Sequence, residues 1–358
     1  VAPSRGLGDV YKRQAVAGNG NYKTQNSIIN ITDGELISTA DYAVYLPQSG
    51  TTTISGGKVY GAAGGVCIQR GTLNVEGTAL ITSKGTGSTG NWGDGTGKLG
   101  CAAINVSGAY GIATVNIKGG TLTAEAESLI TEGTDYTPVI NVTGGTFSDP
   151  SVLKYMATNA TVDIKLLSNI NIAKTELATG YILNAANATA NLNLNGHDII
   201  NSSETADATP FTQIFTVQNG TLNISGNGNV KCDASATAKD DGYRMVIEAR
   251  GYGTVNIHGG SYYNTQKLNT QIDLIYAREN GKINIYGGTF ESGKYGTPNN
   301  DTDGRYWVLN LKNTDKNTAS IQVSGGTFIN FNPANPNMDD NESYLVTGYE
   351  VTRDGSVY

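Results

Sequence analysis

The sequence predicts an all-β solenoid, a parallel β-helix, in two tandem segments that each end in an irregular cap. The first observation is a recurring pattern of an apolar–Asn–apolar strand, a glycine pair, a small hydroxyl residue and an aromatic, as in Ile-Asn-Ile-Tyr-Gly-Gly-Thr-Phe at residues 283–290. The second is composition, since 47 Gly and only 15% charged residues among 358 favour β-structure with many tight turns. The third is the spacing of the copies, which varies from roughly 20 to 40 residues. Variable spacing favours a β-helix over a propeller, because a propeller blade has a steadier length.

The copies of this pattern follow one another along most of the chain. They occupy residues 29–34, 53–57, 73–77, 115–120, 140–145, 222–226, 255–260, 283–288 and 321–326. Copies have an apolar strand upstream, such as residues 66–69, and several have a short segment after the glycines, such as residues 121–122. One coil is therefore predicted to run strand, turn, strand, glycine turn, short strand.

The pattern also predicts where its side chains point. Side chains alternate along a strand, so Ile283 and Ile285 are expected to point inward and Asn284 outward. Coils stack about 4.8 Å apart, so outward Asn side chains in successive coils are close enough to hydrogen-bond as an amide ladder. The glycine pair is explained by a turn with positive φ, where a Cβ would be costly.

Breaks in the pattern divide the chain. Residues 1–14 end in Asp-Val-Tyr-Lys-Arg-Gln, which resembles the translation of a transposon-end adapter used in sequencing libraries, so we leave this stretch out of the fold prediction. The repeat pattern is absent between residues 149 and 201, where residues 150–159 have helical character. A similar irregular segment follows the last copy. Because solenoids need capped ends, we expect one β-helix segment with its cap at residues 15–160 and a second at residues 161–358.

Three kinds of stretch resemble known proteins. Leu-Asn-Gly-His-Asp-Ile at residues 194–199, the Gly-Gly-Thr-Phe coils, and Gly-Tyr-Glu-Val at residues 348–351 resemble right-handed parallel β-helix proteins of gut bacteria and their phages, in the pectate-lyase-like superfamily. The resemblance covers most of the chain after residue 25 and implies a right-handed coil. It implies no single function, because the superfamily includes pectate-lyase-like enzymes, phage tailspike depolymerases and non-enzymatic adhesins or fibres.

Charge and composition exclude several classes of partner. A net charge of −7 and a pI near 4.9 argue against binding nucleic acid or an anionic membrane through bulk electrostatics. No apolar run is long enough to predict a membrane-spanning helix. The cysteines (Cys67, Cys101 and Cys232) are odd in number and form no C-x-x-C motif, so we expect small core or strand residues, with disulfide or metal use as the alternative.

Metal and cofactor signals are equally sparse. His197 and His258 are the only histidines, neither lies near a cysteine, and both are expected to face solvent. Asp301 and Asp303 lie in a loop that resembles part of a calcium-binding loop, although the distal Glu of that motif is missing. They are the one metal candidate, with a polar loop as the alternative, and no cofactor is expected.

The densest group of charged residues falls on two neighbouring coils. It consists of Glu248, Arg250 and Tyr252 in one coil and Tyr276, Arg278 and Glu279 in the next, with Asp240 and Asp241 in a preceding loop. Arg250 and Arg278 have similar places in their coils, so we expect them to stack. A solvated face with Glu/Arg pairing, a surface that binds an acidic or neutral glycan, and a catalytic site of Glu248, Arg250, Arg278 and Glu279 all remain open.

Tyrosines concentrate in the same coils. They include Tyr252, Tyr262, Tyr263, Tyr276, Tyr286 and Tyr295, with Trp307 nearby in the sequence. Exposed aromatic rings cover the C–H faces of sugars while neighbouring polar groups bond the hydroxyls. The predicted ligand-binding residues are Tyr252, Tyr262, Tyr276, Tyr286, Arg250 and Arg278. The alternative is that the tyrosines are half-buried strand residues.

Together these features favour a non-enzymatic module at an extracellular, cell or virion surface that presents a rigid face to glycans or to a cell. The runner-up is a polysaccharide depolymerase, a lyase or hydrolase of the tailspike or pectate-lyase-like type, acting through the region of Glu248, Arg250 and Arg278. A purely structural spacer is the third reading. Assembly as a homotrimer is an open expectation, since fibre and spike proteins often assemble in this way.

Overall fold

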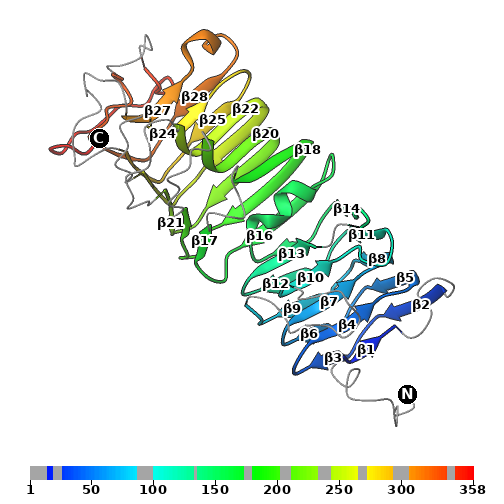
Figure 1. Ribbon diagram of the computed structural model, residues 1–358. Helices are drawn as coiled ribbons and strands as arrows, with labels where there is room; N and C mark the ends of the chain where they lie inside the picture. Colours follow the sequence, from blue (N-terminus) through cyan, green and yellow to red (C-terminus); the bar gives the residue numbers. More distant parts are fainter. Residues whose placement is uncertain are drawn as a thin grey trace. The chain divides into compact units, whose positions relative to one another are not determined.

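The computed structural model is a parallel β-helix and describes residues 14–18, 26–86, 100–132, 135–172, 180–201, 211–232, 243–264, 272–292, 306–336 and 343–358 (Figure 1). The chain forms two compact units, Val1–Ile164 and Lys165–Tyr358. Within each unit the strands of successive coils pair in parallel and build long stacks, which confirms the predicted fold class. No helix in the described ranges has the length and apolarity needed to span a membrane.

In the described part of unit 1, the coils from β1 to β15 each contribute one strand to each of three stacks, and β16 extends the third stack. The first stack contains β1 (Val16–Ala17), β4 (Tyr42–Leu46), β7 (Gly64–Ile68), β10 (Ala102–Val106) and β13 (Glu127–Thr131). The second contains β2 (Asn26–Ile31), β5 (Ser49–Ile54), β8 (Gly71–Val75), β11 (Ala113–Ile117) and β14 (Val139–Val142). The third contains β3 (Glu35–Ser38), β6 (Lys58–Gly61), β9 (Leu80–Ser83), β12 (Thr121–Ala124), β15 (Thr146–Phe147) and β16 (Thr161–Lys165).

The helical character expected after the first run of coils is a short 3-10 helix, η1 (Pro150–Tyr155). Asp149 caps it, because its carboxylate accepts a hydrogen bond from the backbone N–H of Ser151 at 3.0 Å. Val152 and Leu153 of this helix are buried. The helix thus contributes apolar side chains to the core of unit 1.

Unit 2 begins with long strands that cover two sides of the coil. These are β18 (Tyr181–Asn193), β20 (Phe211–Ser225) and β22 (Tyr243–Ile257), and the β18–β20 and β20–β22 pairings contain register shifts. In later coils the same path is divided between β24 (Ile272–Ala277) and β25 (Lys282–Ile285), and between β27 (Tyr306–Leu311) and β28 (Ser320–Val323). The 3-10 helix η2 (Asn313–Asp315) follows β27. The remaining stack contains β17 (Ile170–Ile172), β19 (Ile199–Asn201), β21 (Asn229–Cys232), β23 (Ser261–Asn264), β26 (Thr289–Ser292) and β29 (Thr327–Ile329).

The recurring strand has the predicted orientation. Ile283 and Ile285 are fully buried, and they pair with Val255 and Ile257 of the preceding coil. The outward amides form ladders at 2.8 to 3.0 Å. Asn74, Asn116 and Asn141 form one in unit 1, and Asn191, Asn223, Asn256 and Asn284 form another in unit 2. The amide ladder expected from the sequence is therefore present in both units.

Replacing Asn256 with alanine should lower the free energy of unfolding by about 1 to 2 kcal/mol, because the side chain donates one ladder bond and accepts another. Urea unfolding followed by circular dichroism measures the loss. The matched control is Thr254→Ala, which lies on the same half-buried face of the same strand and makes no ladder bond in the described structure. Equal stability of the two variants would contradict a contribution from the ladder.

Aromatic rings fill the core of unit 2 beside the stack that runs from β17 to β29. The rings of Tyr262, Phe290 and Phe328 are fully buried and lie nearly parallel, with centroids 5.0 Å apart at each step. Phe331 and Tyr344 extend the row past the last coil as tilted neighbours. These two residues come from the irregular segment after β29, so this segment forms a cap over the end of the core.

Candidate functional site

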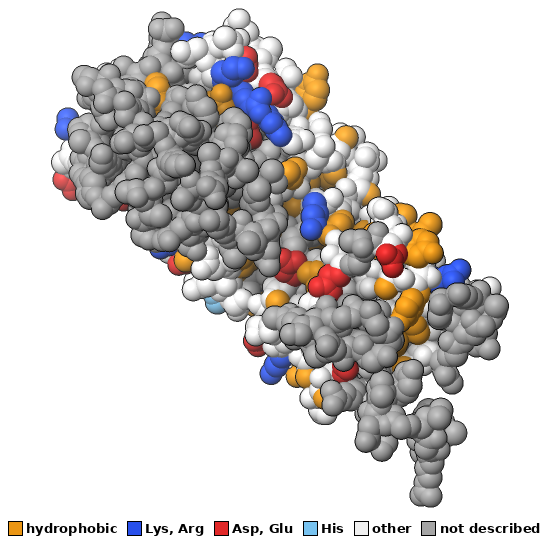
Figure 2. Space-filling view, viewed as in Figure 1, with side chains coloured by type: hydrophobic (Ala, Val, Ile, Leu, Met, Phe, Trp, Pro, Cys, Tyr) orange, Lys and Arg blue, Asp and Glu red, His pale blue; other side chains and the backbone are white. Residues whose placement is uncertain are grey.

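The candidate site is the turn between the first and second strands of the coils in unit 2. We call it the charged corner and define it as Glu248, Arg250, Tyr252, Tyr276, Arg278, Glu279 and Asp315. Ala249 pairs with Ala277 across the sheet, so Arg250 and Arg278 take the same place in successive coils, as the sequence predicts. Figure 2 shows basic and acidic side chains side by side on this part of unit 2, near β25 and β28.

Glu248 is the centre of an ion-pair network. Only 2% of its side chain is exposed, and its Oε1 lies 2.7 Å from Nε of Arg278. Its Oε2 lies 3.9 Å from Nε of Arg250. The same oxygen accepts weaker hydrogen bonds from Gln213 and Thr216 at 3.4 and 3.5 Å. A buried carboxylate is costly unless it is paired and hydrogen-bonded, so Arg278 is the partner that stabilises it most.

Glu279 connects adjacent coils through both its backbone and its side chain. It has a positive φ of 59°, which is uncommon for a residue other than glycine. Its carboxylate lies 2.5 Å from Arg278 and accepts a hydrogen bond from the Gly251 N–H at 2.9 Å. Its own N–H donates to Asp315 at 2.6 Å. Glu279 therefore acts as a link between turns.

The Asp315 end of this link depends on pH. The hydrogen bond from the Glu279 N–H lowers the pKa of Asp315, and the Lys312 ammonium at 3.5 Å acts in the same direction. A carboxylate whose pKa is lowered by folding stabilises the fold above its unfolded-state pKa. This contribution is lost as the pH falls through the lowered value, so the link weakens only in strong acid.

Tyr276 lies beside Arg278 and is half-buried. Burial, with the negative charge of Asp273 as a second cause, raises the pKa of Tyr276 to about 12. Its hydroxyl is therefore protonated at neutral pH and available as a hydrogen-bond donor. Tyr276 is in register with Glu248, and Tyr252, four residues after Glu248 in the adjacent coil, is 76% exposed and stands out from the same corner.

The predicted tyrosine platform is not one surface. Tyr262 belongs to the core, stacked on Phe290, so its prediction as a ligand-binding residue is wrong. Tyr286 is 50% exposed, but its ring stacks on His258, the residue that follows the end of β22, with centroids 4.7 Å apart. Tyr286 is level with His258, six positions after Tyr252, so Tyr252 and Tyr286 lie about 20 Å apart along the strand direction. Only Tyr252 and Tyr276 share the charged corner.

Arg250 differs from Arg278 in its bonding. Its side chain is 32% exposed, and its only ion pair within the described ranges is the 3.9 Å approach to Glu248. The guanidinium makes no hydrogen bond to a described residue, so most of its planar set of five donors is available to a ligand. Gly251, with a positive φ of 58°, separates it from Tyr252 in the turn. The corner therefore offers an available guanidinium beside an exposed ring.

The remaining sequence candidates do not extend this site. Asp240, Asp241, Tyr295, Asp301 and Asp303 lie outside the described residues. Within the described ranges, no group of three or more His, Cys, Asp or Glu side chains is arranged to hold a metal ion. The other singled-out residues are part of the scaffold. Trp307 and all three cysteines are buried, and Tyr263 lies in register between Lys231 and Glu291.

Sequence reasoning missed a pocket of about 640 Å³ in the C-terminal cap of unit 2. The residues that line it are Asn332, Ala334, Asn335, Leu345, Glu350, Val351, Arg353 and Tyr358. Glu350 and Val351 belong to the stretch whose resemblance to other β-helix proteins indicates a coil rather than a site. No local pattern marks the pocket, because it forms only when residues 332–335 and 345–358 come together.

Comparison with known proteins does not assign the function. No model of a protein family matches the chain, and neither the curated proteins nor the solved structures give a significant match. The function has to be inferred from the side chains of the charged corner and from the scaffold that holds them.

Proposed function

We propose that this chain is a non-enzymatic β-helix module of an extracellular, cell or virion surface, related to the pectate-lyase-like superfamily, and that it contacts glycans through the charged corner. The observation that carries the proposal is the pair of Arg250 and Tyr252 in one turn. Arg250 has available donors, and Tyr252 presents an exposed ring.

This pair has the chemistry that sugar recognition needs. A tyrosine ring packs on the C–H face of a pyranose, and its hydroxyl is free to exchange hydrogen bonds with the sugar or with water. A guanidinium donates several parallel hydrogen bonds to hydroxyls, or two to a carboxylate. Tyr276 adds a protonated phenol next to this turn. The corner is thus suited to neutral or acidic glycans.

The pairing of the acidic residues favours binding over catalysis. A glycosidase needs one carboxyl that donates a proton and a second that acts as nucleophile or base. At the charged corner Glu248 is buried against Arg278, and Glu279 is held by Arg278 and the Gly251 N–H. Both carboxylates therefore have structural partners, which supports the non-enzymatic reading over the depolymerase alternative.

The scaffold supports a role in presentation. Amide ladders and aromatic stacks fix the coils of unit 2 relative to one another. Side chains at one corner therefore keep a constant position with respect to those of the next coil. Preorganisation of this kind reduces the entropy lost when an extended ligand binds.

A glycan array probed with the full chain tests this function. The Arg250→Ala/Tyr252→Ala double variant should weaken the bound signals at least about tenfold, which corresponds to about 1.4 kcal/mol. The control is Tyr286→Ala, which removes an equally aromatic, exposed side chain outside the corner and should leave the signals unchanged. Undiminished binding by the double variant would overturn the proposed site. Appearance of shortened glycans during incubation would instead favour the depolymerase.

A further inference from the structure

The cap pocket is built on fixed backbone. Residues 356–358 return along β29, where Phe328 and Tyr358 exchange two backbone hydrogen bonds at 2.8 and 2.9 Å. On the other side, Leu345 bridges Val323 of β28, and the Val346 N–H donates to the Val323 carbonyl at 2.9 Å. Both walls of the pocket are thus tied to the last coil, so the pocket exists before any ligand binds.

The charged group at one end of the pocket is held in place by two contacts. Nε of Arg353 donates to the carbonyl of Gly355 at 2.8 Å, and the guanidinium lies over the ring of Tyr358, 5.2 Å from its centroid. These contacts leave the two terminal nitrogens of Arg353 without a partner among the described residues. A guanidinium that is already oriented and still has free donors is suited to two parallel hydrogen bonds with a carboxylate.

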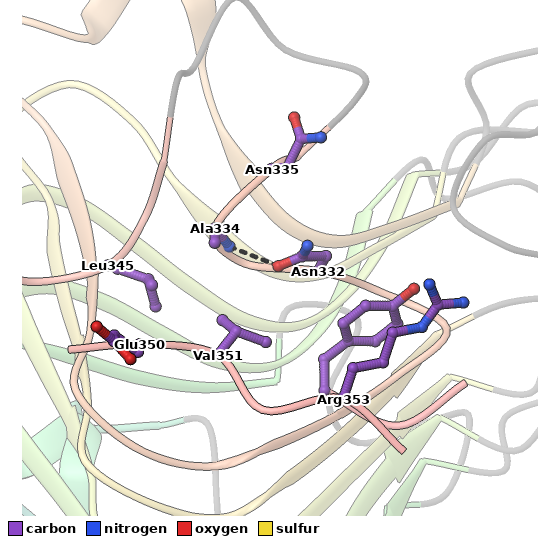
Figure 3. Close-up of a pocket in the computed structure, with 8 residues that line it drawn as sticks. Asn332, Ala334, Asn335, Leu345, Glu350, Val351 and Arg353 are labelled. Atoms are coloured by element: carbon purple, nitrogen blue, oxygen red, sulfur yellow. Dashed lines mark hydrogen bonds between the residues drawn. The ribbon is translucent and has the colours of Figure 1, made fainter. Parts of the chain in front are cut away.

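The other lining residues complement this end. The Oδ1 of Asn332 accepts a hydrogen bond from the Ala334 N–H at 2.9 Å, which orients the side chain, and its amide nitrogen makes no hydrogen bond in the described structure. Figure 3 shows Glu350 and Arg353 on opposite sides of Val351. These two charged side chains do not form an ion pair with each other within the described ranges. Leu345 and Val351 supply an apolar surface between them.

We propose that this pocket binds a sugar that carries a carboxylate, of the uronic or sialic acid class, as a subsite of the glycan surface. The inference rests on the proposed glycan-binding function and adds a second, separate contact to it. The sugar carboxylate pairs with Arg353, and its hydroxyls or amide bond to Asn332 and Glu350. Its C–H groups pack on Leu345 and Val351. Glu350 is compatible with an anionic sugar because it lies across Val351 from Arg353 and accepts hydroxyl or amide hydrogens.

Saturation-transfer NMR with the full chain tests this assignment, using glucuronic acid, galacturonic acid and N-acetylneuraminic acid as probes and glucose as the uncharged comparison. At least one sugar acid should bind saturably, and Arg353→Gln should weaken that binding at least about tenfold, the loss expected for a charged hydrogen-bonding pair. Arg353→Lys keeps the charge but loses the paired donors, so its affinity should lie between that of the wild-type chain and that of Arg353→Gln. Circular dichroism confirms that the exposed substitutions leave the fold intact.

Separate variants distinguish this subsite from the charged corner. The Arg250→Ala/Tyr252→Ala variant should bind the sugar acids with unchanged affinity, whereas Arg353→Gln should not. Failure of the corner variant to change the glycan array would count against the proposed function alone. The cap proposal is overturned if no sugar acid binds the wild-type chain, if glucose binds equally well, or if Arg353→Gln binds undiminished. It is also overturned if the pocket instead takes up free amino acids in preference to sugar acids.

Discussion

Replacing Phe290 with alanine should lower the free energy of unfolding by about 3 to 5 kcal/mol, the range found when a buried aromatic residue is removed. Phe290 is fully buried at the centre of a stack, with Tyr262 on one side and Phe328 on the other, both at 5.0 Å. Its loss leaves a cavity between two coils and removes both ring contacts. The stacked backbone of the neighbouring coils limits how far they can collapse to fill the cavity.

Urea unfolding with far-UV circular dichroism measures this effect. Glu291→Ala is the matched control, because Glu291 is the next residue of β26 and points away from the core. Phe290→Leu should recover part of the loss, since a leucine fills part of the space of the ring. A cost below about 1 kcal/mol for Phe290→Ala would contradict the packing described here, because that is an ordinary value for any single substitution.

Replacing Arg278 with methionine should destabilise the chain by about 2 to 4 kcal/mol, because it leaves the carboxylate of Glu248 buried without its closest partner. The estimate reaches below the range of about 3 to 5 kcal/mol for buried pairs, because a quarter of the Arg278 side chain is exposed and Arg250 lies within 3.9 Å of the same carboxylate. Arg250→Met should cost much less, since its approach to Glu248 is longer.

The double variant Glu248→Leu/Arg278→Met distinguishes the loss of the ion-pair attraction from the cost of leaving the Glu248 carboxylate buried without a partner. Replacing both partners removes the buried carboxylate, so the double variant should be more stable than Arg278→Met alone. Thermal and urea unfolding of Glu248→Leu, Arg278→Met and the double variant complete the double-mutant cycle. If Arg278→Met and Arg250→Met have the same small effect, Glu248 is not stabilised chiefly by Arg278.

The coil itself could be predicted from the sequence because its signals are local. Alternation along three residues is enough to place Ile283 and Ile285 inside and Asn284 outside, and both directions are confirmed. A local signal could also have corrected the wrong prediction for Tyr262. Tyr262 follows Ser261 just as Phe290 follows Thr289, so aligning the coils would have placed its ring in the core.

The burial of Glu248 had only a weak local signal. Its position alternates outward from the core, where most side chains of a solenoid face solvent. The apolar Val246 on the same face is fully buried, so the unbroken apolar run at residues 245–247 is the one local sign that this face is covered. The cap pocket was hidden for a related reason, because its walls come from segments that meet only through long-range pairing. Periodicity reports which way a side chain points, but it does not report what lies over it.

The antiparallel return of residues 356–358 along β29 has a consequence for assembly. Together with Leu345 beside β28, it occupies backbone groups that a further strand would need at the last coil. A second molecule therefore cannot extend the β28 and β29 edges by adding its own strand there. At these two edges an association between molecules has to use side-chain surfaces, whose composition can change without altering the backbone that defines each coil.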